Sequence, residues 1–330
     1  MPELSKVPKN KYSSHGDNLE RVLSKEDSYP TDSETGTGIY FFEGKCRVRI
    51  ANQPELRKKA YQLLHRLYSK MGIAPQESNG MWLSIYDALP ETTTFVVEDD
   101  QGEMAGALTL VLDSPIGLPA DTLYKEEIDR LRSSGRKVSE IISLGISDSA
   151  KGSVKLLASL FYCAYLLSWR LKNYNDFVIT VHARYEKFYC RNILFKKIGE
   201  VRKYAKVNGA STVLLNLPLK LPEMLKGKRR IFPLYMLNYS YQKEIEVTKN
   251  IEAMLTSISE EEFYYFFIEK TNTWEKATPQ QKEYIKKNYP AHQADHFKVS
   301  RALARGFSRK NRNTQNNNEK SIQNKLNGSF

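Results

Sequence analysis

The segment Ser153–Leu171 constrains the fold of this 330-residue chain more than any other. Its residues are apolar nearly all round, which predicts a helix that packs against a sheet and is largely buried. Within it, the uncharged run Leu156–Trp169 is well short of the ~20 residues that span a bilayer. We therefore expect a core helix of a soluble protein.

Strand signals lie on both sides of this helix. Cys46–Ile50 and Ser211–Leu217 alternate between apolar and polar residues in the manner of half-buried strands. Runs of β-branched and aromatic residues predict four further strands, at 93–97, 104–112, 141–146 and 177–181. A turn at Asp99–Gly102 joins the first two of them. Helices are predicted from Pro54 and over Glu186–Lys196. The order β-α-β-β-β-α-β-α-β predicts a mixed central sheet flanked by helices, an α/β or α+β fold.

Composition predicts four regions along the chain. Both ends are polar and poor in apolar residues, which is typical of flexible segments. After the sheet region, Ser259 with Glu262, and Thr278 with Gln281, form the spacing of capping boxes that start helices. The predicted regions are a leader at 1–38, the sheet domain at 39–221, a helical extension packed on that domain at 222–300, and a disordered basic tail at 301–330.

The charge and the cysteines limit the partners and the compartment. A formal net charge of +12 favours an acidic partner, such as nucleic acid, anionic lipid or an acidic carrier protein, although a solvated basic surface explains it equally well. Cys46, Cys163 and Cys190 are odd in number and lack the spacing of metal ligands, which favours a reducing compartment and predicts no metal site. We expect a cytoplasmic protein with at most peripheral membrane contact.

Several segments, taken in order, resemble one family. They are Ser84–Pro90, Thr92–Val96, Asp113–Pro119, Leu123–Tyr124, Glu140–Leu144, His182, Phe188–Tyr189, Ile198–Glu200 and Val207–Ala210. Together they resemble the long-chain N-acyl amino acid synthases, relatives of the acyl-homoserine lactone autoinducer synthases. The resemblance spans residues 45 to 219. It implies a GNAT-like (acyl-CoA N-acyltransferase) fold and transfer of a fatty acyl group to the amine of an amino acid or a similar acceptor.

The resemblance also implies the donor. The family takes the acyl group from the phosphopantetheine thioester of acyl carrier protein, and acyl-CoA is the alternative donor. Two positions depart from the family pattern, because Leu64 and Ser143 stand where the family usually has arginine. Those arginines are thought to bind substrate or to hold the strand glutamate, so these departures leave the acceptor and the activity open.

Three residues are candidates for the proton transfers that acyl transfer to an amine requires. Glu140, at the head of the predicted strand 141–146, would accept the proton of the amine or orient its ammonium form. Tyr189 aligns with the tyrosine that often protonates the leaving thiol in GNAT enzymes, and a phenol is neutral at pH 7. His182, at the end of the preceding strand, would orient these groups or carry a proton. The competing interpretations are a solvated glutamate, a packed tyrosine and a structural histidine.

The other candidates bind substrate. The resemblance places backbone N–H groups of Leu144–Ile146 at the thioester carbonyl, next to Ser143, and Gly145 would ease close approach of a ligand. Lys151, Gly152 and Ser153 are what remains of a loop that cradles pantetheine phosphates at a helix N-terminus. An ordinary strand-to-helix turn is the alternative. Asp87 would meet the ammonium group of the acceptor.

The basic segment Arg184–Lys206 overlaps the predicted thiol side of the site, so it is the predicted docking surface for an acidic acyl carrier protein. Unpartnered surface lysines and arginines are the competing explanation. Two other functions stay open: an acetyl-CoA-dependent acetyltransferase, and a catalytically silent acyl-binding or regulatory module. We expect no nucleic-acid binding, because the basic residues match no recognised motif.

Overall fold

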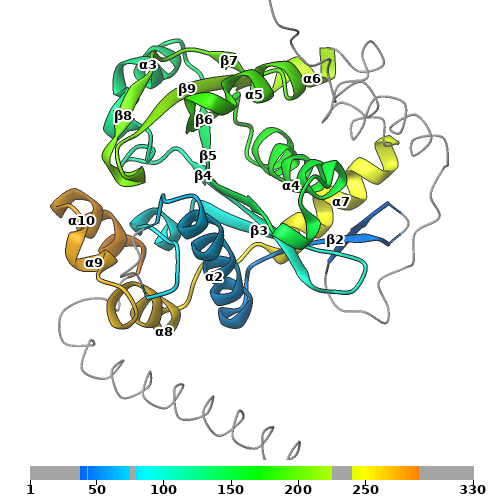
Figure 1. Cartoon of the computed structure of the whole chain (residues 1–330), viewed down its shortest axis with the longest axis horizontal. Helices are drawn as coiled ribbons and strands as arrows, with labels where there is room; N and C mark the ends of the chain where they lie inside the picture. The colour runs from blue at the N-terminus through cyan, green and yellow to red at the C-terminus, as the bar shows by residue number, and fades with distance from the viewer. Residues whose placement is uncertain (1–37, 43, 75–78, 225–239, 290–330) are drawn as a thin grey trace, which may run out of the picture.

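The computed structural model describes residues 38–42, 44–74, 79–224 and 240–289 (Figure 1). The predicted tail at 301–330, and all of the predicted leader except Gly38, lie outside the described residues. The described part contains one mixed sheet with helices on both of its faces (Figure 1).

The sheet has the strand order β1-β2-β3-β4-β5-β6-β9-β7, and β8 pairs with β9. Every described strand pair is antiparallel except the central pair β5 and β6, which is parallel. The strands are β1 (Ile39–Phe41), β2 (Cys46–Ile50), β3 (Thr92–Glu98), β4 (Met104–Leu112), β5 (Val138–Ile146), β6 (Asp176–His182), β7 (Lys196–Lys197), β8 (Arg202–Tyr204) and β9 (Ala210–Pro218).

The parallel pair comes apart along its length. Pairing between β5 and β6 begins at Val138 and ends where Glu140 lies opposite Val178. Both strands continue beyond this point, β5 to Ile146 and β6 to His182. The carboxyl halves of the two central strands therefore diverge, and they leave a gap in the middle of the sheet.

One face of the sheet is covered by α4 (Val154–Tyr165), by the π-helix η3 (Leu166–Leu171) that continues it, and by α7 (Tyr241–Met254) beside it (Figure 1). Phe95, Leu108 and Ile141 point from the strands into this core. The segment Val154–Leu171 is long and apolar enough to cross a membrane, but 67% of it is buried inside the protein. It therefore has the environment of a core helix.

The opposite face is covered by α2 (Pro54–Lys70) and α3 (Asp121–Ser133). Ala60 and Leu64 of α2 pack on Val96 and Ala107, which are buried strand residues of this face. Four short helices from the C-terminal region join this side of the molecule beside α2 (Figure 1). They are α8 (Glu260–Phe263), the π-helix η7 (Tyr264–Glu269), α9 (Thr273–Lys276) and α10 (Pro279–Asn288). Both predicted capping boxes are present, at Ser259 and at Thr278.

Three local predictions were wrong. The helix α3 was not predicted, and its buried residues Tyr124 and Ile128 belong to an otherwise strongly charged segment that is kinked at Tyr124. The helix predicted over Glu186–Lys196 is α5 (Glu186–Asn192), which ends early because Leu194 takes a left-handed φ of 66°. The central strand begins at Val138 rather than at 141, so Glu140 lies within β5.

A buried ion pair joins the sheet domain to the C-terminal helices. The guanidinium of Arg57 in α2 donates to Glu262, and the side chains are only 6% and 10% exposed. Removing one partner of a buried pair leaves the other charge uncompensated. We expect Arg57→Met to lower the free energy of unfolding by about 3 to 5 kcal/mol, measured by urea denaturation.

The control for this prediction is Lys125→Met, which removes the exposed pair between Lys125 and Asp129. Exposed pairs contribute little, so this variant should lose less than about 1 kcal/mol. Equal losses in the two variants would show that the pair between Arg57 and Glu262 does not stabilise the fold.

Candidate active site

The gap between β5 and β6 exposes the backbone of Leu144 to a side chain from α2. The N–H of Leu144 donates to the hydroxyl of Tyr68 over 3.0 Å, and this hydroxyl donates back to the Leu144 carbonyl oxygen over 3.2 Å. One phenol thus satisfies both polar groups of a residue that has left the β5–β6 ladder. Tyr68 is a site residue that the sequence did not reveal, because it lies on α2, 76 positions away along the chain.

The ladder decides which of the predicted N–H groups face the gap. The N–H of Leu144 points to Tyr68, whereas the N–H of Ser147 donates to Ala105, next to the start of β4. Because backbone groups alternate along a strand, the N–H groups of Leu144 and Ile146 point away from β4, toward the gap. Those of Ser143 and Gly145 point toward β4. Leu144 and Ile146 are therefore the predicted donors whose N–H groups face the gap, and that of Leu144 is bonded to Tyr68 in this structure.

Gly145 is required for a reason other than the predicted one. A Cβ atom at this position would lie 2.6 Å from Cδ1 of Leu67 and 3.2 Å from Cδ2 of Leu64, both on α2. The glycine therefore allows α2 to pack closely on β5, and this packing brings Tyr68 to Leu144. Leu64 is itself buried in that contact.

Tyr189 approaches the gap from α5, on the β6 side of the sheet. Its ring packs edge-on against Phe188 and Phe195. Burial raises the pKa of the phenol, and the neighbouring phenol of Tyr68 raises it further. Tyr189 and Tyr68 therefore lie within electrostatic range of each other, and both keep their protons at neutral pH.

Glu140 lies at the vertex of the gap and is only 3% exposed. Its carboxylate accepts the N–H of Ala120 over 2.8 Å. The sequence placed this glutamate at the head of the strand 141–146, with a solvated position as the alternative; it is buried inside β5. Burial raises the pKa of the Tyr86 phenol to about 12, and the nearby charge of Glu140 adds to the effect. Tyr204 is influenced by Glu140 in the same way, which places two phenols close to the carboxylate.

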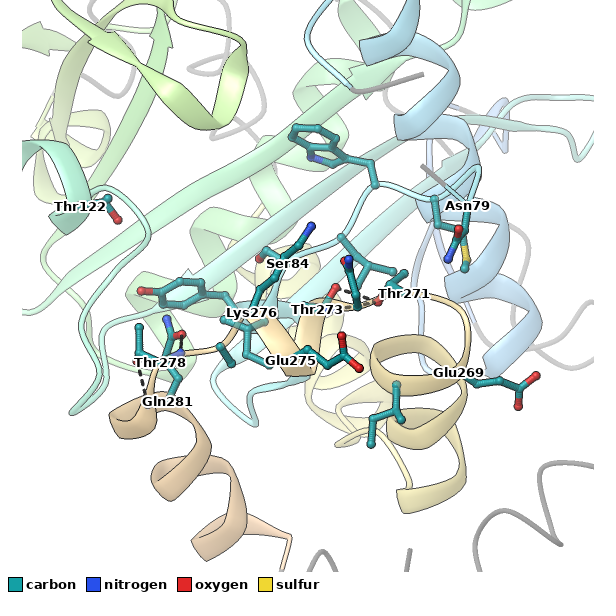
Figure 2. A pocket seen from close by; sticks show the side chains of 18 residues that line it. Asn79, Ser84, Thr122, Glu269, Thr271, Thr273, Glu275, Lys276, Thr278 and Gln281 are labelled. Carbon is teal, nitrogen blue, oxygen red and sulfur yellow. Dashed lines mark hydrogen bonds between the residues drawn. The ribbon is translucent and has the colours of Figure 1, made fainter. Parts of the chain in front are cut away.

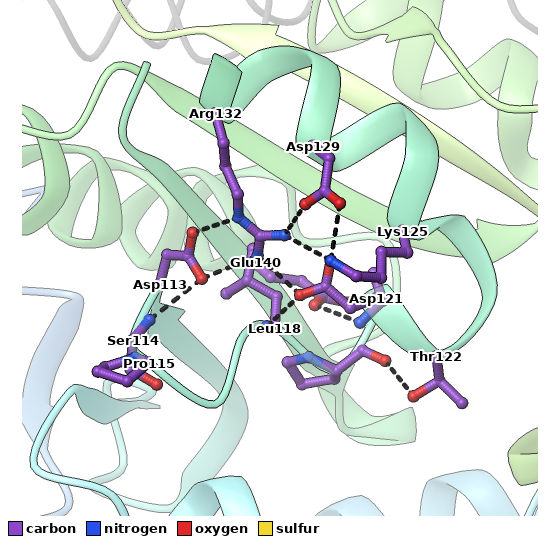
Figure 3. A network of polar contacts seen from close by, with 12 residues as sticks. Asp113, Ser114, Pro115, Leu118, Asp121, Thr122, Lys125, Asp129, Arg132 and Glu140 are labelled. Carbon is purple, nitrogen blue, oxygen red and sulfur yellow. Dashed lines mark hydrogen bonds and ion pairs between the residues drawn. The ribbon is translucent and has the colours of Figure 1, made fainter. Parts of the chain in front are cut away.

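A network centred on Arg132 holds the loop that contacts Glu140 (Figure 3). The guanidinium donates to Asp113 at 2.7 and 2.9 Å, and to Asp121 at 2.7 Å. Asp121 in turn accepts the N–H of Leu118 over 2.6 Å. The loop from Asp113 to Asp121 is thus tied to α3 at both ends, and this fixes the Ala120 N–H in front of Glu140.

Asp87 lies inside the short 3-10 helix η1 (Ile85–Ala88), where it forms a capping box with the N-cap residue Ser84. Its carboxylate accepts from the backbone N–H of Ser84 over 2.7 Å and from the Ser84 hydroxyl over 3.0 Å. The residue is 7% exposed, so its carboxylate is buried against Ser84 rather than in open contact with solvent.

Burial raises the pKa of the Asp87 carboxyl to about 6, above the ~3.9 of an unfolded chain. Between about pH 4 and pH 6 the folded state therefore binds more protons than the unfolded state. Proton binding at Asp87 favours the folded state at low pH, and this contribution to stability is lost as the pH rises. We expect the stability of the wild type relative to Asp87→Asn to fall by about 1 to 3 kcal/mol from pH 4 to pH 7. Urea unfolding of both proteins at the two pH values measures this, and a constant difference would contradict it.

The remaining predicted residues lie at the rim of the gap. The Nδ1 atom of His182, at the end of β6, accepts the N–H of Arg184 over 3.2 Å and so starts a 3-10 turn. Ser153 caps α4, its hydroxyl accepting the N–H of Leu156 over 3.5 Å. Lys151 and Gly152 are exposed in the turn before it.

The predicted basic segment divides into two parts. Arg202 is bound to Glu127, and Lys197 pairs with Glu200. The other part lies on the 3-10 turn η4 (Ala183–Tyr185) and on α5, where Arg184, Lys187 and Arg191 are exposed beside the exposed rings of Tyr185 and Phe188. This second part adjoins Tyr189.

The comparison with protein families covers this whole arrangement. Residues 59–218 match the family model described as "N-acyl amino acid synthase FeeM". This region is similar to the FeeM family of N-acyl amino acid synthases. The match covers just under half of the 330 residues, begins in α2 and ends with β9. It includes every residue assigned to the gap, and together with the mixed sheet and its flanking helices it identifies the predicted GNAT-like fold.

Three solved structures illustrate the likeness of the FeeM-type domain. FeeM from uncultured soil microbes is 23% identical, with 53% of this chain and 91% of that chain covered and a TM-score of 0.46. A mutant of the spermidine N-acetyltransferase SpeG from Vibrio cholerae is 14% identical, covering 53% and 95% with a TM-score of 0.37. The ribosomal-protein-S5-alanine acetyltransferase from Vibrio fischeri covers 56% and 97%, at 14% identity and a TM-score of 0.37. No curated protein matches the chain significantly.

Proposed function

We propose that the FeeM-type domain transfers a fatty acyl group from an acyl carrier protein thioester to the amine of an amino acid, giving an N-acyl amino acid. The observation that carries this proposal is the gap between β5 and β6. Around it lie a backbone donor at Leu144, a buried carboxylate at Glu140 and a partly buried phenol at Tyr189.

In the proposed reaction, the neutral amine attacks the thioester carbonyl carbon. The carbonyl oxygen takes the Leu144 N–H as the tetrahedral intermediate forms, in the place that the Tyr68 hydroxyl occupies in this structure. Glu140 accepts the amine proton, directly or through a water molecule. The tetrahedral intermediate then collapses. Its C–S bond breaks while the new C–N bond is kept, and the departing thiolate takes the proton of Tyr189.

The exposed cations Arg184, Lys187 and Arg191 support the choice of donor, because acyl carrier proteins are acidic. The exposed ring of Phe188 lies among them, one residue from Tyr189. A carrier protein docked on this surface would present its phosphopantetheine arm to the gap. We place the reaction in the cytoplasm, with at most peripheral contact with membranes.

The test incubates purified protein with fatty acyl carrier protein thioesters and the common amino acids. We expect free thiol and an N-acyl amino acid detected by mass spectrometry. Complete absence of both products would refute the proposal. Turnover and thermal stabilisation with acetyl-CoA alone would instead support an acetyltransferase.

A catalytically silent acyl-binding module is the second candidate, and one observation favours it. Tyr68 occupies the Leu144 N–H that the thioester would need. Fatty acyl ligand retained through purification, combined with no thiol release in the assay above, would support this function.

A further inference from the structure

A pocket of about 960 Å³ lies beside the gap and between two regions of the chain (Figure 2). The segment 79–86 forms one wall, and the residues from η7 to α10 form the other. The second wall lies wholly outside the FeeM family match, which ends at residue 218. The C-terminal helices therefore shape a cavity that the matched domain by itself would lack.

Two residues that line this pocket lie beside residues of the gap. The ring of Trp82, which lines the pocket, packs edge-on on Tyr68 with the ring centroids 4.9 Å apart. Tyr86 also lines the pocket and lies close enough to Glu140 for the carboxylate to raise the pKa of its phenol. A molecule in the pocket would therefore lie one side chain away from Tyr68, through Trp82, and from Glu140, through Tyr86.

The lining of the pocket favours a small ligand with polar groups over a fatty acyl chain. The wall at 79–86 offers apolar surface, but the C-terminal wall and Thr122 offer mainly polar and charged groups (Figure 2). A hydrocarbon chain placed there would remove these groups from water without giving them new hydrogen-bond partners. A small molecule with one apolar and one polar end satisfies both walls.

The charges of α9 define the polar end. Glu275 and Lys276 both line the pocket, and neither side chain forms an ion pair with another residue in the described part of the chain. The helix is held in place, because Trp274 packs edge-on on Phe263 and the Thr278 cap follows directly. An ammonium group on a fixed helix is suited to bind a carboxylate.

We propose that this pocket binds the amine acceptor and that Lys276 binds its carboxylate, so that the acceptor is an amino acid rather than a simple amine. The inference rests on the proposed acyl transfer, with the amine of the bound amino acid turned toward Glu140. The C-terminal helices would then determine which acceptor the FeeM-type domain uses.

A binding experiment tests the pocket without requiring turnover. Saturation-transfer NMR on the full chain, with the twenty common L-amino acids as probes, identifies the amino acid that binds best. Its dissociation constant is then compared with that of the amine formed by removing its carboxyl group. We expect the amino acid to bind about twofold to fivefold more tightly, the range for an exposed charge pair.

Three variants locate the effect. Lys276→Met should abolish the preference for the amino acid over its amine. Glu275→Gln, on the same helix but of opposite charge, should keep or increase it. Lys286→Met is the matched control, because Lys286 is exposed on α10 and does not line the pocket.

The outcomes separate this inference from the proposed function. If Lys276→Met keeps the wild-type preference, or if none of the twenty amino acids binds, the pocket is not the acceptor site, even where acyl transfer is observed. If the preference depends on Lys276 but no thiol is released, the pocket assignment stands and the proposed reaction is wrong.

Discussion

Glu140→Gln is expected to lower kcat for acyl transfer by about 100-fold or more, because a carboxamide cannot accept the proton of the attacking amine. The substitution preserves shape, so the amide oxygen can still accept the Ala120 N–H that the carboxylate now accepts. Binding of the thioester should change little, since its carbonyl contacts Leu144 rather than Glu140. Thiol release from acyl carrier protein thioester, measured with saturating acceptor, gives the rate.

The pH dependence makes this prediction specific. A variant without a base depends on amine that has lost its proton in solution, so its rate should rise more steeply with pH than that of the wild type. Glu98→Gln is the matched control, since Glu98 is a buried glutamate on β3 that is paired with Arg47 and Arg49. That control should lose stability but not kcat. A folded Glu140→Gln protein with the wild-type rate would show that Glu140 is not the base and only binds the Ala120 N–H of the loop.

Tyr189→Phe is expected to lower kcat by about 100-fold when thiolate departure limits the rate, because the phenylalanine ring fills the same space without a proton to donate. The pKa of this phenol is raised by burial, so the proton stays on the oxygen until a thiolate develops beside it. Pre-steady-state release of thiol separates this step from substrate binding.

Tyr68→Phe is the matched control, and it should act in the opposite direction. It removes the phenol that now holds the Leu144 N–H. The thioester carbonyl would then no longer compete with the Tyr68 hydroxyl for the Leu144 N–H. KM for the donor should therefore fall by about threefold to tenfold, the effect of one hydrogen bond. Loss of kcat in Tyr68→Phe, with normal kcat in Tyr189→Phe, would show that Tyr68 rather than Tyr189 protonates the leaving thiolate.

Local signals in the sequence predicted many of the structural elements. The capping boxes at Ser259 and Thr278 each predicted a helix that the structure contains, because a capping box depends only on residues three positions apart. The alternation at Cys46–Ile50 and the apolar helix after Ser153 were correct for the same reason. The helix α3 escaped prediction because its charged residues hide the few buried ones, and their burial depends on the sheet beneath.

The sequence by itself determined the longer strands of the central sheet, the buried helix on one face of that sheet, and the similarity of residues 59–218 to an acyltransferase family. Only the tertiary structure decided that β5 and β6 diverge after Glu140, that Tyr68 meets Leu144 in the gap, and that α9 faces Trp82 across a pocket. The physical reason is the range of the interactions. Periodicity reports which side of one element is apolar, whereas a site depends on which distant elements that side packs against.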